Sequence, residues 1–212
     1  MIPRMHLFEF EDQAWLPKSL RTVVTDILGF FLRRSQMYRN MGPVLAQLIR
    51  TMGETKVLDL CSGSGGPARE VVGLAEKELN VKCDLMLSDK FPSDPDIAYY
   101  DAMGAETNER RLRTMFTALH HFRPEQVRSI LSRATKDQAA IAVFEFTQRS
   151  LKGILFMFIG IPIIFLCSPF IRPFRWSRLF WVYVIPAAPF VLFWDGVVSA
   201  LRSYRSNELM DF

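Results

Sequence analysis

Residues 57–67 constrain the fold more than any other part of the chain. They read Val-Leu-Asp-Leu-Cys-Ser-Gly-Ser-Gly-Gly-Pro: a short, mostly apolar run, then a turn rich in glycine and serine, and then a proline. Glycine lets a turn fold tightly and approach a ligand closely. Proline is tolerated in the first turn of a helix, where backbone donors have no partner. The segment therefore predicts a buried strand, a tight turn and a helix that begins near Pro67.

Strand and helix patterns alternate through the middle of the chain. Apolar runs predict strands at 57–60, 84–88, 97–100, 115–119 and 140–146, and the clearest helices between them are at 67–78 and 124–134. Strands separated by helices form parallel sheets that helices cover on both faces. We therefore expect an α/β domain at 54–150, with a parallel sheet and flanking helices.

Residues 1–53 show a helical pattern instead. Leu20, Val23 and Ile27 recur at steps of three and four residues, which is typical of one apolar helix face, and Gly42-Pro43 separates this helix from a second, shorter one. The first twelve residues include acids where a secretory signal has an apolar core. We expect an N-terminal helical cap and a chain that is not exported.

The last third of the chain explains its unusual composition. The protein is 50% hydrophobic and has a positive mean hydropathy of +0.11, although 23% of its residues are charged. Residues 153–171 contain no charge, and a second uncharged run follows at 179–194. The first run is about as long as a bilayer span, which takes ~17–25 residues. We expect 151–205 to form an apolar, membrane-associated helical segment.

Three arrangements of this segment are possible. A spanning hairpin would place Arg172, Arg175 and Arg178 outside the cell, against the positive-inside tendency. We therefore expect a monotopic or re-entrant segment, with these arginines at the lipid headgroups. The alternative is a lid packed on the N-terminal helices, which is compatible with membrane contact.

Charge and cysteine usage exclude several classes of function. Three cysteines lie far apart without a C-x-x-C pair, so neither a disulfide framework nor a metal site is indicated. The net charge of +4 is spread along the chain without a basic block. This pattern disfavours nucleic acid as a partner and favours an anionic membrane surface.

The turn at 61–66 favours a cationic nucleoside as its ligand. No Gly-Lys-Ser/Thr follows, which excludes a Walker A loop, and the glycine spacing differs from that of dinucleotide sites. Asp59 is poorly suited to a phosphate but well suited to a cationic group. Asp89 ends the second predicted strand, where a carboxylate can accept hydrogen bonds from ribose hydroxyls.

At these residues the chain resembles class I S-adenosylmethionine-dependent methyltransferases, which have a Rossmann-like fold. Residues 59–65 look like their first motif, Asp89 matches the ribose-binding acid, Asp101-Ala102 resembles the pair beside the adenine, and residues 117–122 look like the fourth-strand motif. The resemblance implies S-adenosyl-L-methionine as cofactor, bound by Asp59, Cys61, Ser62, Gly63, Gly65, Asp89, Lys90, Asp101, Ala102 and Thr117.

Four of these positions carry alternatives. The alternative for Asp59 is a helix N-cap, and for Asp89 it is an acid in a loop. Cys61 stands where the family usually has its first glycine, and a left-handed backbone would cost more at cysteine. Asp101 either contacts the cofactor or only caps a turn.

A narrower resemblance concerns a poorly characterised bacterial branch that joins this domain to an apolar segment. Residues 8–12, 120–126 and 194–204 look like its recurring blocks, and no substrate carries over from it.

Methyl transfer from a sulfonium is an in-line displacement, which depends mainly on positioning. A base is needed only when the acceptor must lose a proton. His120 and His121 are candidates, with Glu145, Tyr99 and Tyr100 more remote. The alternative is that one histidine packs in its loop and the other is solvated.

Together these observations predict methyl transfer to a hydrophobic small molecule or lipid at the cytoplasmic face of a membrane, with a cytoplasmic location as the alternative. The second hypothesis is a cofactor-binding or inactive subunit of a membrane complex.

A helix start at 206–212 is followed at once by the last residue, whereas methyltransferases of this class usually finish with a further helix and an antiparallel strand pair. We expect a truncated chain or natural fragment without the last two strands, and a partner chain that covers the exposed sheet edge.

Overall fold

The computed structural model describes residues 2–63, 65–90, 92, 95–104 and 110–212, apart from the side chain of Arg33. The chain forms two compact units. Unit 1 consists of Met1–Met37 and Thr147–Arg205, and unit 2 consists of Tyr38–Phe146 and Ser206–Phe212. Each is described here by itself.

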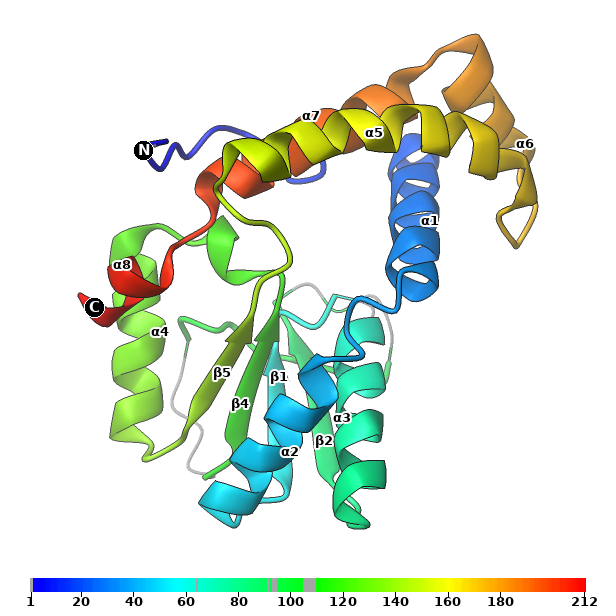
Figure 1. Ribbon diagram of the computed structural model, residues 1–212. Helices are drawn as coiled ribbons and strands as arrows, with labels where there is room; N and C mark the ends of the chain where they lie inside the picture. Colours follow the sequence, from blue (N-terminus) through cyan, green and yellow to red (C-terminus); the bar gives the residue numbers. More distant parts are fainter. Residues whose placement is uncertain (1, 64, 91, 93–94, 105–109) are drawn as a thin grey trace. The chain divides into compact units, whose positions relative to one another are not determined.

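Unit 2 contains a five-stranded sheet (Figure 1). Its strands are β1 (Lys56–Leu60), β2 (Asp84–Asp89), β3 (Ile97–Tyr99), β4 (Leu112–Phe116) and β5 (Ile141–Phe144), in the order β3-β2-β1-β4-β5. All four neighbouring pairs are parallel. The predicted α/β class and parallel sheet are therefore confirmed.

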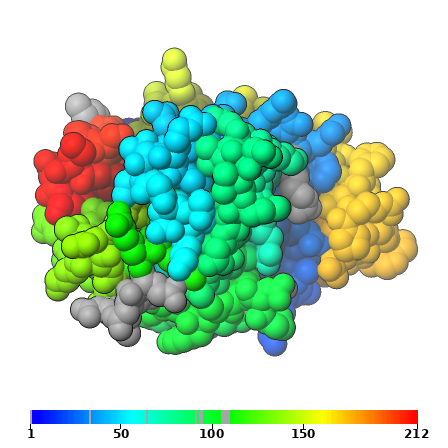
Figure 2. Space-filling view, turned by 90° about the horizontal axis from the view of Figure 1, so that it is seen from below, coloured from blue at the N-terminus to red at the C-terminus, as the bar shows by residue number. Residues whose placement is uncertain are grey.

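Helices α2 (Met41–Met52), α3 (Gly66–Leu79), α4 (Pro124–Lys136) and α8 (Ser206–Met210) complete unit 2. Figure 2 shows α2 and α3 side by side on one face of the molecule. Their backbones approach closely at Gly42, where a Cβ atom would lie 2.6 Å from Cβ of Leu74. The predicted break at Gly42-Pro43 is in fact the first turn of α2, where proline costs no hydrogen bond.

The fourth strand was predicted three residues too late. It ends at Phe116 because Thr117 adopts a left-handed backbone, with φ of 51°, so residues 117–119 lie beyond the strand. The start of β4 could not be recognised from the apolar pattern, because Arg113 is a charged residue in a strand that is buried throughout. Its guanidinium is compensated by an ion pair with Asp137.

Unit 1 is helical. Helices α1 (Lys18–Arg34), α5 (Leu151–Cys167), α6 (Trp176–Leu179) and α7 (Ala187–Arg202) are joined by short 3-10 and π segments at Ser168–Phe170 and Phe180–Val184. Helices α5 and α7 pack side by side (Figure 1). The core of the unit is formed by Leu16, Leu20, Val23, Val24 and Ile27 together with Ile164, Ile171, Val182, Ala188 and Val191.

The two units divide the chain differently from the segments expected at 1–53, 54–150 and 151–205. Helix α2 belongs with the sheet, because Leu45 and Ile49 are buried and the helix packs on α3. Residues 1–37 belong instead with the apolar segment. The expected cap is therefore split between the units after Met37.

Prolines affect the apolar segment unequally. Pro162 lies inside α5 without ending it. Pro186 and Pro189 lie at the start of α7, where the axis turns by 77° from the preceding helical stretch, Trp176–Val184. Helix α5 with its 3-10 extension, Leu151–Phe170, is long and apolar enough to cross a membrane, and the bent pair would pass the same test only if counted as one span.

One expectation for the arginines is wrong. Arg178 does not face outward: its side chain is 1% exposed and is paired with Asp26 of α1 at 2.7 Å. It also donates hydrogen bonds to the carbonyl oxygens of Ile171 and Pro173. Burial of a guanidinium requires such compensation, so Arg178 fixes the loop before α6 to α1.

Two of the blocks that carry the narrower resemblance meet in unit 1. The backbone N–H groups of Phe10 and Glu11 donate to the two carboxylate oxygens of Asp195, at 2.7 and 3.0 Å. Further bonds join Trp194 to Phe8, and Arg202 to Leu7 and Asp12. Residues 8–12 therefore form a strap along α7, which we name the N-terminal strap.

Candidate functional site at the carboxyl edge of the sheet

The candidate residues follow the ends of five parallel strands. Because parallel strands share one carboxyl edge, the residues after each strand gather at that edge of unit 2. The glycine turn follows β1, Asp89 ends β2, Asp101 follows β3, Thr117 and His120 follow β4, and Glu145 follows β5. The order of the strands reverses between β1 and β4, the place where open α/β sheets bind ligands.

The glycine turn is fastened to β2 by Ser62. Its N–H donates to the carbonyl of Ser88 at 2.9 Å, and its hydroxyl accepts from the N–H of Ser88 at 3.0 Å. The same hydroxyl donates to the carbonyl of Asp59 at 3.0 Å. The predicted contribution of Ser62 is thus to hold the turn in place. Ser64, within the turn, lies outside the described residues.

Three residues of the turn have left-handed backbones: Cys61, Gly63 and Gly65, with φ of 57°, 56° and 72°. A Cβ atom at Gly65 would lie 2.4 Å from Cδ1 of Leu87, so only glycine fits between the turn and β2. A Cβ atom at Gly63 would meet no atom of the described residues within 4 Å. The turn is therefore closed toward the sheet and open above Gly63.

Asp59 lies under the turn and is 1% exposed. Its carboxylate accepts a hydrogen bond of 2.7 Å from the hydroxyl of Thr114, which is its direct neighbour on β4. Burial raises the pKa of Asp59 to about 6, against the lowering effect of hydrogen bonds from Ser62 and Thr114. Its negative charge thus sits in the sheet, at the point where the strand order reverses.

Asp89 closes the other side of the turn. Its Oδ2 accepts a hydrogen bond of 2.9 Å from the N–H of Gly63. Its backbone carbonyl accepts from the N–H of Tyr100 at 3.0 Å, which joins the end of β2 to the residue after β3. The predicted ribose-binding carboxylate is therefore in direct contact with the predicted cofactor turn.

Asp101 and Lys90 form an ion pair of 2.9 Å. The hydrogen bond with Lys90 lowers the pKa of Asp101, helped by the N–H of Met103, and correspondingly raises the pKa of Lys90. Asp101 also caps a turn, because Met103 donates to its Oδ1 at 3.0 Å. The alternative role of Asp101, capping a turn, is therefore confirmed. Asp101 also lies beside the candidate site, because it is paired with Lys90.

The carboxylates of Asp89, Asp59 and Asp101 act together on Cys61. Burial, followed by the charges of these three groups, raises the pKa of the Cys61 thiol to about 12. The negative charges of all three carboxylates thus contribute to the raised pKa of Cys61. Three carboxylates therefore lie near the glycine turn, one of them paired with Lys90, and Arg69 lies against the turn at Gly65.

Two of the candidate bases come together after β4 and β5. The buried His120 ring contacts Glu145 through Nδ1 at a distance of 2.8 Å, and the backbone N–H of His120 donates to the other carboxylate oxygen at 3.2 Å. His121 is exposed, and its ring packs on that of His120 with centroids 4.3 Å apart. Sequence reasoning named these residues but did not predict that His120 and Glu145 pair.

The remaining predicted residues lie at or after the carboxyl ends of β3 and β4. Thr117 adopts the left-handed backbone that ends β4, and its buried hydroxyl lies near the phenol of Tyr38. Ala102 is buried, whereas the side chain of Tyr99 is 72% exposed.

Sequence reasoning missed Thr114 and Ser88, which hold Asp59 and the turn. The hydroxyl of Ser88 donates to the carbonyl of Asp59 at 2.7 Å. Both are fully buried polar residues on the two strands that flank β1. The only signal in the sequence was a hydroxyl residue within an apolar strand, and its partner depends on the strand order.

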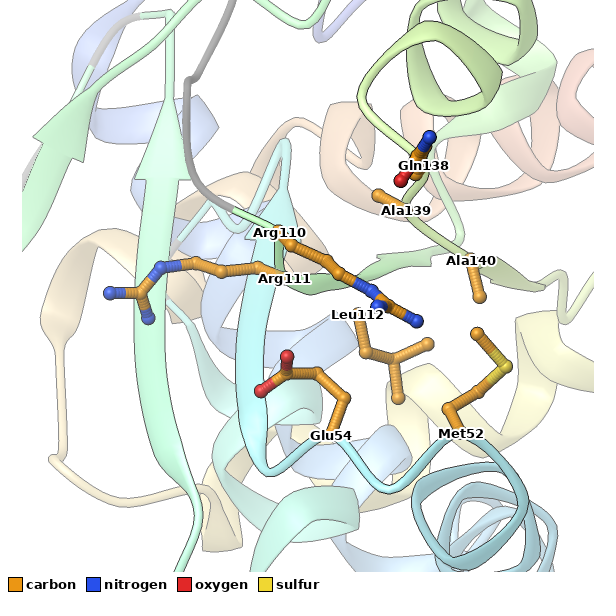
Figure 3. Close-up of a pocket in the computed structure, with 8 residues that line it drawn as sticks. All are labelled: Met52, Glu54, Arg110, Arg111, Leu112, Gln138, Ala139 and Ala140. Atoms are coloured by element: carbon orange, nitrogen blue, oxygen red, sulfur yellow. The ribbon is translucent and has the colours of Figure 1, made fainter.

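A small pocket lies at the opposite, amino edge of the sheet (Figure 3). Leu112 points into it from the start of β4, Met52 from the end of α2, and Ala140 from the residue before β5. Arg111 points away from the pocket and pairs with Asp84 on β2. The pocket contains none of the predicted site residues and is not the candidate site.

Comparisons with known proteins add nothing to this geometry, because no family model, curated protein or solved structure matches the chain.

Proposed function

We propose that this chain is an S-adenosylmethionine-dependent methyltransferase with a Rossmann-like fold, and that its acceptor is a hydrophobic small molecule or lipid at the cytoplasmic face of a membrane. The observation that carries the proposal is the hydrogen bond from the N–H of Gly63 to Oδ2 of Asp89, which joins an acid at the end of β2 to the glycine turn after β1, at the carboxyl edge of a parallel sheet.

The strand order supports the fold part of the proposal. The order β3-β2-β1-β4-β5 is that of the first five strands in doubly wound nucleotide-binding sheets. In such sheets the ligand lies outside the carboxyl ends at the point of reversal. The candidate residues lie at that point, which is why we prefer this reading to an unrelated α/β domain.

The charges support a sulfonium nucleoside rather than a dinucleotide. A pyrophosphate at this turn would lie beside the carboxylate of Asp89, above the buried Asp59. Of the cations near the turn, Lys90 is paired with Asp101 and Arg69 lies 3.9 Å from Asp96. A cationic ligand gains from the same carboxylates. The open side of Gly63 leaves room for such a ligand beside Asp89.

In the proposed reaction, S-adenosylmethionine supplies an electrophilic methyl group on a positively charged sulfur. The acidic edge holds the cation, Asp89 accepts hydrogen bonds from hydroxyl groups, and the rigid turn orients the ligand for in-line attack. The methyl–sulfur bond breaks as the bond from the acceptor to the methyl forms, and the sulfur leaves as a neutral thioether.

The His120–Glu145 pair provides a route for a proton when the acceptor carries one. When Nδ1 carries the ring proton, it donates a hydrogen bond to Glu145, and the lone pair lies on Nε2. An acceptor hydroxyl or amine would pass its proton to that nitrogen. An acceptor without a proton to lose would leave the pair with a structural role only.

The experiment that tests the proposal follows the methyl group. Cell membranes are incubated with the purified protein and S-adenosylmethionine labelled in its methyl group, and the organic extract is counted. We expect labelled lipid or small molecule with the wild type and background counts with Asp89→Ala. The matched control is Asp84→Ala, at the other end of the same strand, which should retain transfer.

If the wild type binds the cofactor but no labelled methyl group appears in the organic extract, the proposal that the protein is a methyltransferase is contradicted. That result would favour the alternative of a cofactor-binding subunit.

A further inference from the structure

Helix α5 presents a broad apolar face that none of the described residues covers. Ile164 is the one buried residue of the helix, and about 11% of its spanning window is buried. Leu155, Ile159 and Leu166 recur along one face, flanked by Phe156, Phe158 and Ile163, and most of these are more than half exposed. A soluble helix keeps such a face toward the core, so this face is built for contact with something apolar.

Other exposed apolar side chains of unit 1 follow α5 along the chain. Phe170 and Trp176 border the loop after the helix and are 75% and 77% exposed. Tyr183, Val184 and Phe190 continue the series near the bend before α7. Large aromatic side chains of this kind are enriched where a protein meets the boundary of a bilayer.

The net positive charge of the protein comes from the same unit. Unit 1 contains twelve Lys and Arg against five Asp and Glu, which gives +7, whereas unit 2 contains fourteen against seventeen, which gives −3. The sum of +4 in the whole chain conceals this difference. A basic unit with an uncovered apolar helix complements an anionic lipid surface.

Ion pairs at both ends of the apolar segment oppose a crossing of the bilayer. After α5, Arg175 and Arg178 are paired with Asp26 in the middle of α1. At the end of α7, Arg202 is paired with Asp12 of the N-terminal strap. A spanning α5 would carry the first of these charged attachments across the hydrocarbon layer, which is costly.

Several polar side chains near α5 are bonded within unit 1, so the exposed apolar face of α5 is the part of this unit that suits contact with lipid. Asp195 is bonded to the N-terminal strap, and Trp181 donates to Ser19 of α1. By contrast, the outer face of α5 carries no charge beyond Lys152 at its start. A helix of this kind lies in the plane of the interface, with its apolar face among the acyl chains.

We propose that unit 1 binds an anionic lipid bilayer monotopically, through the exposed face of α5, without crossing it. The inference refines the membrane location in the proposed function, but it does not depend on cofactor binding or methyl transfer. It also assigns the buried Arg178 to holding the fold, and leaves the exposed Arg172 to meet headgroups.

The first test measures binding of the purified full chain to vesicles, without cofactor. Wild type should float with vesicles of phosphatidylcholine and phosphatidylglycerol, and bind at least about tenfold more weakly to phosphatidylcholine alone or at high salt. Phe156→Ser with Ile159→Ser should weaken binding to the anionic vesicles by about tenfold or more. Val81→Ser, an exposed apolar residue of unit 2, is the matched control and should bind as wild type does.

Folding is checked by circular dichroism and thermal melting of each variant. If the double variant is unfolded, Leu166→Ser replaces it, since that side chain is 71% exposed and contributes little to the core. The same loss of binding is expected.

The second test distinguishes a monotopic from a spanning arrangement. Arg172→Cys is added to preformed anionic vesicles and treated with a membrane-impermeant maleimide, and labelled peptides are identified by mass spectrometry. We expect Cys labelling at position 172 without detergent. Labelling only after detergent would mean that α5 spans the bilayer, and would overturn the proposal.

Two other results would also overturn it. One is the absence of wild type from all anionic vesicle fractions. The other is a dimer in sedimentation that buries the α5 face and excludes vesicles. Because neither test uses S-adenosylmethionine, their failure would leave the methyltransferase proposal standing, and failure of methyl transfer would leave the vesicle results standing.

Discussion

Cys61 occupies a backbone conformation that favours glycine. Its φ of 57° lies in the left-handed region, which costs a residue with a Cβ atom about 1–2 kcal/mol. Cys61→Gly should therefore raise the free energy of unfolding by about 1 kcal/mol, measured by chemical denaturation. Cys61→Ala is the control and should show no such gain, because alanine retains the Cβ atom. A gain of equal size with alanine would mean that the thiol, and not the backbone, is the source of strain.

Asp59 gives the protein a predictable dependence on pH. Its pKa is raised from 3.8 to about 6 by burial, so the folded state holds the proton more tightly than the unfolded chain. The stabilisation is complete below pH 3.8 and is lost as the pH rises to about 6. Asp59→Asn, which can still accept from Thr114, should remove this loss and stabilise the protein above pH 6 by up to about 3 kcal/mol.

The measurement is thermal or chemical unfolding of both proteins over this pH range. Parallel curves for wild type and Asp59→Asn would contradict the raised pKa. The same variant should bind S-adenosylmethionine more weakly, because the site loses one of its negative charges.

His120 and His121 are neighbours with different surroundings, and they provide a matched pair. His120→Ala leaves the carboxylate of Glu145 without its main partner, and should lower the free energy of unfolding by about 1–3 kcal/mol. His121 is exposed, and His121→Ala should change the free energy of unfolding by about 0.5 kcal/mol or less. Chemical denaturation checks both values, and equal losses would show that the pairing with Glu145 carries no special stability.

At the scale of elements, the turn between β1 and α3 depends on Gly65. A methyl group there would lie 2.4 Å from Leu87, and φ is 72°. Gly65→Ala should cost about 2–4 kcal/mol from strain and overpacking, and should abolish cofactor binding. Gly73→Ala lies in the middle of α3 with open space around it, and should be neutral or stabilising by about 0.5–1 kcal/mol. Tolerance of Gly65→Ala would contradict the close packing of the turn.

How far the elements were predictable depends on how local their causes are. Strands β1, β2, β3 and β5 and helices α3 and α4 follow from apolar runs and from Pro67 and Pro124, which act within a few residues. Strand β4 was misplaced because its start depends on a buried ion pair between Arg113 and a residue 24 positions away, and its end on a left-handed threonine. Neither cause is visible in a local pattern.

The residues of the candidate site also divide into those with a local signal in the sequence and those whose role depends on distant strands. Asp59, the glycines and Asp89 were found because they stand at strand ends next to a turn. Thr114 was missed because its role exists only when β4 lies beside β1. The pairing of His120 with Glu145 likewise depends on β5 being the neighbour of β4. Strand order, a long-range property, is therefore what the sequence concealed.

At the scale of the whole molecule, the chain combines two units of opposite chemistry. Unit 2 carries the candidate site at the sheet edge and a net charge of −3, and unit 1 carries the apolar helix and a net charge of +7. Unit 1 is assembled from both ends of the sequence, through the bonds between the N-terminal strap and α7. Removal of residues 2–12 should therefore destabilise unit 1 while leaving the sheet folded.

Hydrogen exchange on this deletion checks that separation. We expect amides of α7 to lose protection and amides of β1 and β4 to keep it. Equal loss in both units would show that they unfold together.

The central claim, that the carboxyl edge of the sheet binds a cationic nucleoside, is tested most directly by isothermal titration calorimetry with S-adenosylmethionine. The account predicts saturable binding by wild type and by Asp84→Ala, and a loss of about tenfold or more in affinity for Asp89→Ala, which removes a charge-assisted partner. A folded wild type that shows no binding to S-adenosylmethionine or to its demethylated product would contradict it.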